Sequence, residues 1–199
     1  MLRDTAIPRR HMTEELYSNT YILLRLISGG QTGVDRAALD VALELGIPAG
    51  GWCPAGRRSA RGPIPSRYPL IETETAAYPQ RTRQNIRDSD ATLVITRGEP
   101  AGGTRLTVSL AEKLKRPCLV IDLSAQRFQA ARIAIVEWLQ NLQPAILNVA
   151  GPRASESPGL ARSVRAILRD VLAPPSADSH STPWPPKRPR TPKLPGMAE

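Results

Sequence analysis

The chain has 199 residues, of which 41% are hydrophobic and 23% are charged, and its 27 basic residues against 18 acidic ones give a formal net charge of +9. This composition supports a buried core and excludes a wholly disordered chain, a collagen and a coiled coil. Two cysteines are too few for a secreted disulfide scaffold, so a cytoplasmic protein with reduced thiols is expected. The longest apolar stretch near the start, at 21–27, is too short to cross a bilayer, and no signal peptide is recognised, so no membrane partner is expected.

The sequence predicts three segments: an N-terminal extension at 1–20 without clear periodicity, a folded domain at 21–173 and a tail at 174–199. The tail contains eight prolines, a density that favours a disordered or polyproline-like segment. The predicted domain holds 20 basic and 13 acidic residues, so most of the excess charge belongs to it. That charge indicates attraction for an anion, or else an ordinary solvated surface rich in arginine.

Short apolar runs alternate with amphipathic stretches along the predicted domain. The first run, at 21–28, predicts a buried strand, and apolar residues from Val34 to Leu45 then recur at helical spacing until Gly46 ends the pattern. Residues 47–80 contain six prolines and predict a long ordered loop with short strands near 49–53 and 68–72.

Three further pairs of a strand and a helix follow. The strands are expected at 91–96, 118–123 and 145–150. After a loop at 97–103, the helices are expected to carry Leu106 to Leu114, then 128–142, then 160–171. This alternation predicts a Rossmann-like three-layer α/β/α fold around a mostly parallel sheet.

Three glycine-bearing loops, at 28–36, 98–104 and 150–153, are expected at the carboxyl ends of these strands. Parallel α/β sheets bind their ligands at that edge. Glycine lets the backbone approach a ligand closely, and the N–H groups of the following helix attract phosphate or another oxyanion. One Gly-Gly pair after a strand is more often a tight turn, but three such loops at one edge favour a binding site.

Standard nucleotide fingerprints are absent from these loops. None ends in Gly-Lys-Ser/Thr, and the first lacks the Gly-x-Gly-x-x-Gly spacing of dinucleotide-binding proteins. The first loop remains compatible with a mononucleotide or a phosphorylated cofactor. Asp35 has several open interpretations: a favourable interaction with its helix dipole, a bond to a ligand hydroxyl or amine, or the fixing of Arg36.

The string Ser28-Gly-Gly-Gln-Thr-Gly-Val-Asp-Arg-Ala-Ala-Leu-Asp40 resembles the opening of the putative molybdenum carrier family. That family is a circularly permuted branch of the Rossmann-like group that includes the lysine-decarboxylase-like (LOG) phosphoribohydrolases. The resemblance continues through Gly50-Gly-Trp-Cys-Pro-Ala-Gly-Arg57 and Asn148-Val-Ala-Gly-Pro152, and it covers nearly all of 26–160. It implies a homo-oligomer, a dimer or tetramer, that binds molybdenum cofactor, a pterin with a terminal phosphate and an oxo-metal. Such a protein would store the cofactor or hand it to an acceptor molybdoenzyme.

One segment departs from the family pattern. Where the family usually has Arg-x-Ala-Glu-Asp-Gly, this chain has Arg57-Arg-Ser-Ala-Arg-Gly62, so both acids are lost, at Ala60 and Arg61. A role that needs those carboxylates in the family is therefore not expected in this chain. The added arginine makes this loop more attractive to anions.

The hydrolase relatives carry Gly-Gly-x-Gly-Thr-x-x-Glu, and the corresponding stretch here has Thr107 where the essential glutamate stands. A threonine cannot act as a carboxylate base, so phosphoribohydrolase chemistry is not expected. The two histidines, His11 and His180, lie outside the predicted domain, which removes the commonest base and metal ligand. The sequence therefore offers no catalytic residue and no metal ligand, and Cys53 and Cys118 are interpreted as structural.

The resulting hypothesis is a basic cleft that binds a phosphorylated or oxyanionic small ligand, held by N–H groups and arginines. The ligand-binding candidates are Gly29, Gly30, Gln31, Thr32, Gly33, Asp35, Arg36, Arg57, Arg81, Asn85, Gly102, Gly103, Thr104 and Arg153. The alternative is a nucleotide-binding enzyme or sensor of the LOG-like superfamily. Nucleic-acid binding is less favoured, because the predicted domain has few aromatic side chains on which bases could stack.

Overall fold

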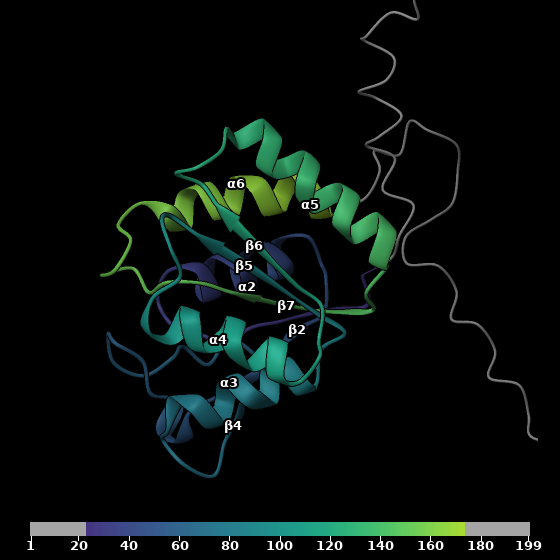
Figure 1. Cartoon of the computed structure of the whole chain (residues 1–199). Helices are drawn as coiled ribbons and strands as arrows, with labels where there is room; N and C mark the ends of the chain where they lie inside the picture. The colour runs from purple at the N-terminus through teal and green to yellow at the C-terminus, as the bar shows by residue number, and fades with distance from the viewer. Residues whose placement is uncertain (1–22, 174–199) are drawn as a thin grey trace, which may run out of the picture.

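The structure is a computed structural model that describes residues 23–173, so the predicted N-terminal extension and the predicted tail lie outside the described residues. Five parallel strands form the main sheet in the order β2-β1-β7-β5-β6, and two short parallel strands pair separately as β3-β4 (Figure 1). The strands are β1 (Arg25–Ile27), β2 (Ala49–Gly50), β3 (Trp52–Cys53), β4 (Ile71–Glu72), β5 (Ala91–Thr96), β6 (Cys118–Asp122) and β7 (Ile146–Ala150).

Helices cover both faces of the main sheet, which confirms the Rossmann-like three-layer fold (Figure 1). One layer contains α2, α5 and α6, which pack on one another, and the opposite layer contains α3 and α4. The helices are α2 (Val34–Glu44), α3 (Tyr78–Arg87), α4 (Gly102–Lys113), α5 (Phe128–Leu142) and α6 (Leu160–Leu172). Within residues 23–173, no helix is both long enough and apolar enough to cross a membrane.

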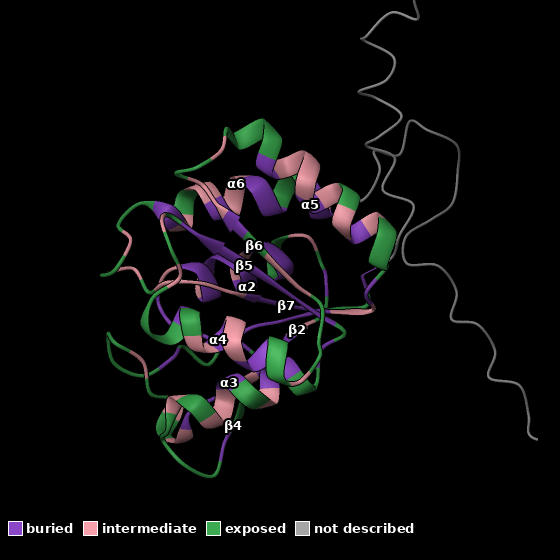
Figure 2. Ribbon diagram, in the orientation of Figure 1, coloured by how far each residue is buried: buried purple, intermediate pink, exposed green. Residues whose placement is uncertain are grey.

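The core lies between the main sheet and its helices, as the buried residues in Figure 2 show. All six residues of β5 are buried, and their sequence shows no polar alternation, which is typical of a parallel strand covered on both faces. Leu93 and Ile95 belong to the large cluster that also includes Leu147 and Val149 of β7. A smaller cluster around Ile86 of α3 joins that helix to α4.

Two helices differ from the sequence expectation. Apolar periodicity does not predict α3, because only Thr82, Asn85 and Ile86 among its ten residues are buried. Helix α4 begins at Gly102, inside the stretch expected to be a loop, so its two glycines are residues of the first helical turn. The first strand is also shorter than expected and spans Arg25–Ile27 in the described residues.

The connections after β5 and β7 leave the sheet toward opposite faces. Strand β5 leads into α4 of one layer, whereas its neighbour β7 leads into α6 of the other layer. A crevice opens at the carboxyl ends of two neighbouring strands whose connections diverge in this way, and it is where open α/β sheets bind ligands.

Candidate functional site

A cleft of about 240 Å³ lies at this point of divergence, between the loops that follow β1, β5 and β7 and the first turns of α3. Seven of the expected site residues line it: Gln31, Asp35, Arg81, Gly102, Gly103, Thr104 and Arg153. The other lining residues are Tyr78, Pro79, Thr82, Leu106, Thr107, Ala150, Gly151 and Glu156. Residues named from the sequence therefore make up about half of the lining of the cleft.

The N-terminal end of α4 forms an open wall of the cleft. No side chain caps this end, and its first turn contains no acidic residue. A Cβ atom added to Gly102 or Gly103 would meet no atom within 4 Å, so the backbone here borders free space. Because the first N–H groups of a helix have no partner within the helix and carry its positive dipole, this wall attracts an anion.

A buried ion pair forms the floor of the cleft. Nη1 of Arg81 donates to Oδ2 of Asp35 at 3.0 Å, and the two side chains are 15% and 3% exposed. The backbone N–H of Gln31 donates to the same oxygen at 3.2 Å. Burial raises the pKa of Asp35, while the Arg81 charge and the Gln31 N–H act to lower it. Among the interpretations of Asp35 left open by the sequence, none named this partner, which comes from a helix that the sequence did not predict.

The glycines of the first loop, at 28–36, leave room for the pair of Asp35 and Arg81 and for the loop at 150–153. A Cβ on Gly29 would overlap the Arg81 guanidinium, so the absence of a side chain allows Arg81 to reach Asp35. A Cβ on Gly33 would lie 2.5 Å from the carbonyl oxygen of Pro152. On Gly30 it would lie 2.5 Å from Cδ1 of Leu70. These glycines are packing positions, and none of the three lines the cleft.

The first loop also holds the segment 57–62 in place. Oε1 of Gln31 accepts hydrogen bonds from the backbone N–H groups of Thr32, at 2.9 Å, and Ala60, at 3.0 Å. Arg36 donates to the Gly30 carbonyl at 3.1 Å and to Oγ of Ser59 at 2.8 Å. Ala60, where the family acid is missing, therefore sits beside a cleft-lining side chain.

The expectation of a basic cleft is corrected by the charges of the lining residues. Arg81 is paired with Asp35, and Nε of Arg153 lies 2.8 Å from Oε1 of Glu156. The four charged lining residues therefore carry two positive and two negative charges. Spacing along the chain cannot reveal the pair of Asp35 and Arg81, because these residues are 46 positions apart.

Two further candidates lie away from the cleft and brace the backbone. The Arg57 guanidinium donates to four carbonyls of the expected ordered loop, those of Ile64, Pro65, Tyr68 and Leu70, at 2.9 to 3.3 Å. Asn85 donates to the Trp52 carbonyl at 3.0 Å and accepts from the Trp52 N–H at 2.8 Å. Thr32 has a comparable bracing role, since its hydroxyl accepts from the Ala154 N–H at 3.4 Å.

The lining residues that sequence reasoning missed come mainly from α3 and from the second turn of α4. Tyr78 and Pro79 supply an aromatic and an aliphatic surface, and the exposed Arg58 guanidinium lies 5.9 Å from the Tyr78 ring centroid. Thr107, singled out as the replaced glutamate, does line the cleft, and its hydroxyl donates to the Gly103 carbonyl at 3.1 Å. Pro79, which lies in the first turn of α3, was the available sequence signal for the start of this helix.

The thiols and carboxylates offer no metal site in the part of the chain that the structure describes. Cys53 is buried, and burial raises the pKa of its thiol. Burial also raises the pKa of Cys118 to about 11. Both thiols are therefore protonated near neutral pH, in agreement with the structural interpretation of the two cysteines.

The fold defines a Rossmann-like α/β protein with a cleft at the point where the strand connections diverge. The sequence profile of the circularly permutated YpsA SLOG family matches residues 26–172, and the chain belongs to this family. The crystal structure of a putative molybdenum carrier protein from Syntrophus aciditrophicus is similar, with 43% sequence identity and a TM-score of 0.75. The match covers 77% of this chain and 97% of that protein. A comparison with curated proteins gave no match.

Proposed function

We propose that the protein binds a phosphorylated or oxyanionic small ligand in the cleft, and that this ligand is molybdenum cofactor, which the protein stores or hands over. The observation that carries the proposal is the uncapped N-terminal end of α4, whose glycine backbone borders the cleft. The name of the Syntrophus aciditrophicus relative supports the choice of ligand. Main-chain N–H groups would supply the attraction for the anion that the paired arginines do not.

The remaining lining residues suit the organic part of such a ligand. Tyr78, Pro79 and Leu106 offer an apolar wall for a flat ring, and Thr82 and Thr104 bring hydroxyl groups to the same cleft. The volume of about 240 Å³ lies below the ~300–1,000 Å³ of typical ligand pockets, so the cleft would enclose part of the ligand.

The charges of the cleft favour a binding protein over an acid–base enzyme. Its two carboxylates, Asp35 and Glu156, are both engaged by arginines. Thr107 stands at the position of the hydrolase glutamate, and its hydroxyl is bonded to the helix backbone. A general acid or base must be free to reach the reacting atom, which neither carboxylate is in this arrangement.

The test is to purify the full chain from cells with an intact pterin-cofactor pathway and to measure bound molybdenum and pterin. The Gly103→Asp variant places a carboxylate among the α4 N–H groups, where it stabilises the helix and competes with an anionic ligand. We expect the wild type to carry both molybdenum and pterin and the variant to carry neither. Ser109→Asp, farther along the same helix, is the control and should keep the ligand. A wild-type protein that lacks both and takes up no added cofactor contradicts the proposal.

The second candidate function is a nucleotide-binding enzyme or sensor, which the SLOG family membership and the Tyr78 wall favour. A thermal-shift screen of nucleotides distinguishes the two, because a ligand that binds the folded state raises its melting temperature. Stabilisation by a nucleotide, lost in Gly103→Asp, together with no retained molybdenum, would select this second function.

The proposed quaternary structure is a dimer or tetramer. Phe128 and Leu142, at the two ends of α5, are 40% and 37% exposed, which leaves apolar surface for contact between copies. Static light scattering on the full chain tests this, and a mass equal to one chain contradicts it.

A further inference from the structure

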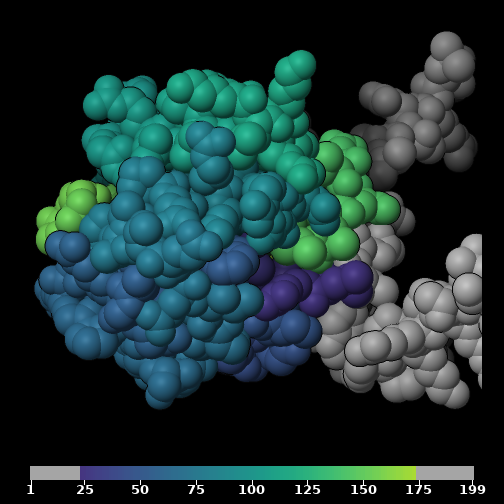
Figure 3. Space-filling view, turned by 90° about the horizontal axis from the view of Figure 1, so that it is seen from below, coloured from purple at the N-terminus to yellow at the C-terminus, as the bar shows by residue number. Residues whose placement is uncertain are grey.

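The two helix layers carry different net charges. Helix α3 has three arginines and no acidic residue, and residues 102–116 have four basic residues against Glu112 alone. The helices of the opposite layer, α2, α5 and α6, contain five basic and five acidic residues. Arg81 is paired with Asp35 in the cleft, and the rest of this excess charge lies on the α3–α4 face. Figure 3 shows this side of the molecule.

The two layers also differ in how their charges are paired. In the α2, α5 and α6 layer, Arg165 and Arg169 bind Asp40 and Glu44 at 2.7 and 2.8 Å, and Arg132 binds Asp170 at 3.3 Å. On the α3–α4 face, four exposed cations have no ion pair within residues 23–173: Arg83, Arg105, Lys113 and Lys115. These cations are available to an external partner.

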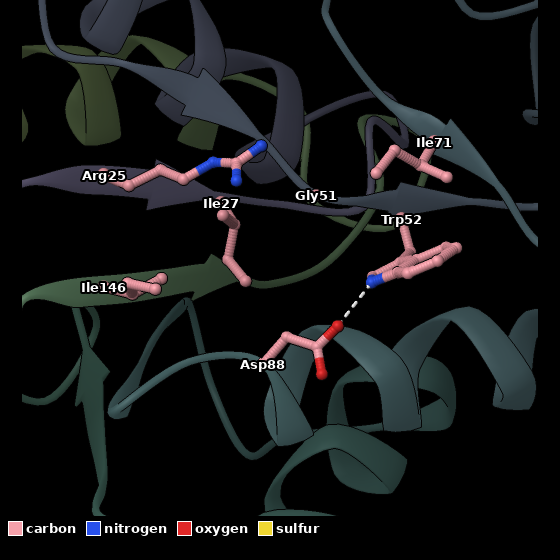
Figure 4. Close-up of a pocket in the computed structure, with 7 residues that line it drawn as sticks. All are labelled: Arg25, Ile27, Gly51, Trp52, Ile71, Asp88 and Ile146. Atoms are coloured by element: carbon pink, nitrogen blue, oxygen red, sulfur yellow. Dashed lines mark hydrogen bonds between the residues drawn. The ribbon is translucent and has the colours of Figure 1, made fainter. Parts of the chain in front are cut away.

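A small socket of about 100 Å³ adjoins the C-terminal end of α3 (Figure 4). Its apolar lining includes Ile27, Ile71 and the Trp52 indole, and Arg25 lies at its side. Nε1 of Trp52 donates to Oδ2 of Asp88 at 2.7 Å, which fixes the ring, while Ile71 is 52% exposed. The socket thus combines preorganised apolar walls with a guanidinium group, and Arg87 of the α3–α4 face immediately precedes Asp88.

We propose that the α3–α4 face and this socket together form a docking surface for an acidic protein segment that inserts one aliphatic side chain. Charge complementarity selects the acidic partner, and the fixed indole and isoleucines provide the kind of central apolar contact that dominates protein interfaces. A protein side chain fills an apolar socket, which a phosphate backbone does not. Arg105 directly follows the cleft-lining Thr104, so one end of this surface borders the cleft, while the socket lies at the opposite end of α3.

The test uses fluorescence anisotropy with the full chain and three labelled probes. The first is a polyglutamate peptide with one central leucine, the second has glycine in place of leucine, and the third is a single-stranded oligothymidylate of matched charge. We expect the leucine peptide to bind about tenfold more tightly than the glycine peptide, because only leucine fills the socket. Ile71→Ser, which changes an exposed side chain, should remove this preference. No preference for leucine, or tighter binding of the oligothymidylate, overturns the proposal.

A matched pair of charge reversals tests the face itself. Arg83→Glu on α3 should weaken both peptides about fivefold at low salt, whereas Arg162→Glu on α6 should change them less than about twofold. Both arginines are exposed, so folding is preserved in each variant. Equal effects of the two reversals contradict a localised surface. Gly103→Asp adds a carboxylate near Arg105 and far from the socket, so it should keep the preference for leucine while it removes ligand binding in the cleft, and the two functions can fail independently.

Discussion

Two Gly-Gly pairs follow strands of the same sheet, and they serve opposite physical purposes. At Gly29-Gly30 the space of each missing side chain is taken by protein atoms, the Arg81 guanidinium in one case and Leu70 in the other. At Gly102-Gly103 the corresponding space is empty and borders the cleft. The first pair allows the protein to pack against itself, and the second leaves the backbone of α4 open to a ligand.

This difference shows that a glycine-rich loop is an ambiguous signal. Both pairs follow a strand at the same edge of the sheet, one before α2 and the other at the start of α4, and nothing in their local sequence separates them. What separates them is a side chain from α3, about 50 residues further along the chain than the first pair. Substitutions at these loops should therefore divide into those that cost stability and those that cost binding.

The largest effect is expected from Arg81→Ala, which leaves the buried Asp35 carboxylate without its partner. Loss of one member of a buried ion pair lowers the free energy of unfolding by about 3–5 kcal/mol. Chemical denaturation measures the change, and Arg83→Ala on the exposed face of the same helix is the control. A loss of less than about 1 kcal/mol, as for an exposed pair, would show that Asp35 does not need Arg81.

The stability of the same variant should depend on pH more strongly than that of the wild type. Without Arg81, burial remains the main influence on the pKa of Asp35 and raises it further above its ordinary value. The folded state then holds a proton that the unfolded chain has released, so stability is fullest below the unfolded pKa and falls as the pH rises through the folded pKa. Denaturation of the variant at about pH 5 and about pH 8 should therefore show lower stability at the higher pH, relative to wild type.

Gly33→Ala should be the next most destabilising change, by about 3 kcal/mol. Gly33 has φ of 93°, and an added Cβ would lie 2.5 Å from the Pro152 oxygen and 2.7 Å from the Ala154 nitrogen, both backbone atoms. Gly46→Ala is a matched control, because Gly46 also has positive φ, 69°, but its Cβ would meet nothing within 4 Å. If thermal unfolding shows the same loss of stability in the two variants, the close approach of Gly33 to the loop at 150–153 is unimportant.

Gly29→Ala should cost about 2 kcal/mol, since it displaces the Arg81 guanidinium without straining the backbone. The reason can be isolated with a double-mutant cycle, in which Gly29→Ala is also made in the Arg81→Ala background. There most of its cost should disappear, because the overlap with the Arg81 guanidinium is gone and only Oδ2 of Asp35 still lies close to the added Cβ, at 2.9 Å. Additive costs in the cycle would contradict the assigned role of Gly29.

Gly103→Ala should have the smallest effect on stability and should raise the free energy of unfolding by about 0.5 kcal/mol, as alanine does in helices. Its effect should instead fall on the ligand, because the methyl group narrows the space beside the α4 N–H groups. Molybdenum and pterin content of the purified variant should be lower than in the wild type. A destabilised variant with unchanged ligand content would reverse the distinction between the two glycine pairs.

The fold could be predicted well from the sequence, because a long apolar run such as β5 indicates a buried strand. The residues that line the cleft could be predicted only in part. The sequence does not distinguish an arginine whose guanidinium faces a ligand from one whose guanidinium is bonded to backbone carbonyls. Arg57 illustrates this, since it lies in a glycine-containing loop with other arginines and yet is bonded to four backbone oxygens. Tyr78 and Thr82 were missed because α3 buries too few apolar residues to show a helical period.

The position of β7 in the sheet has a consequence for how the chain folds. This strand is the last one in the sequence, yet it lies between β1 and β5 and forms the hydrogen bonds that join them. Until it emerges from the ribosome, the other strands of the main sheet can form only two separate pairs, β2-β1 and β5-β6, and the cleft between these pairs does not exist. The main sheet is therefore completed only when the C-terminal part of the domain is available. The pairing of β1 with β7, across some 120 residues, is the kind of distant contact that slows folding.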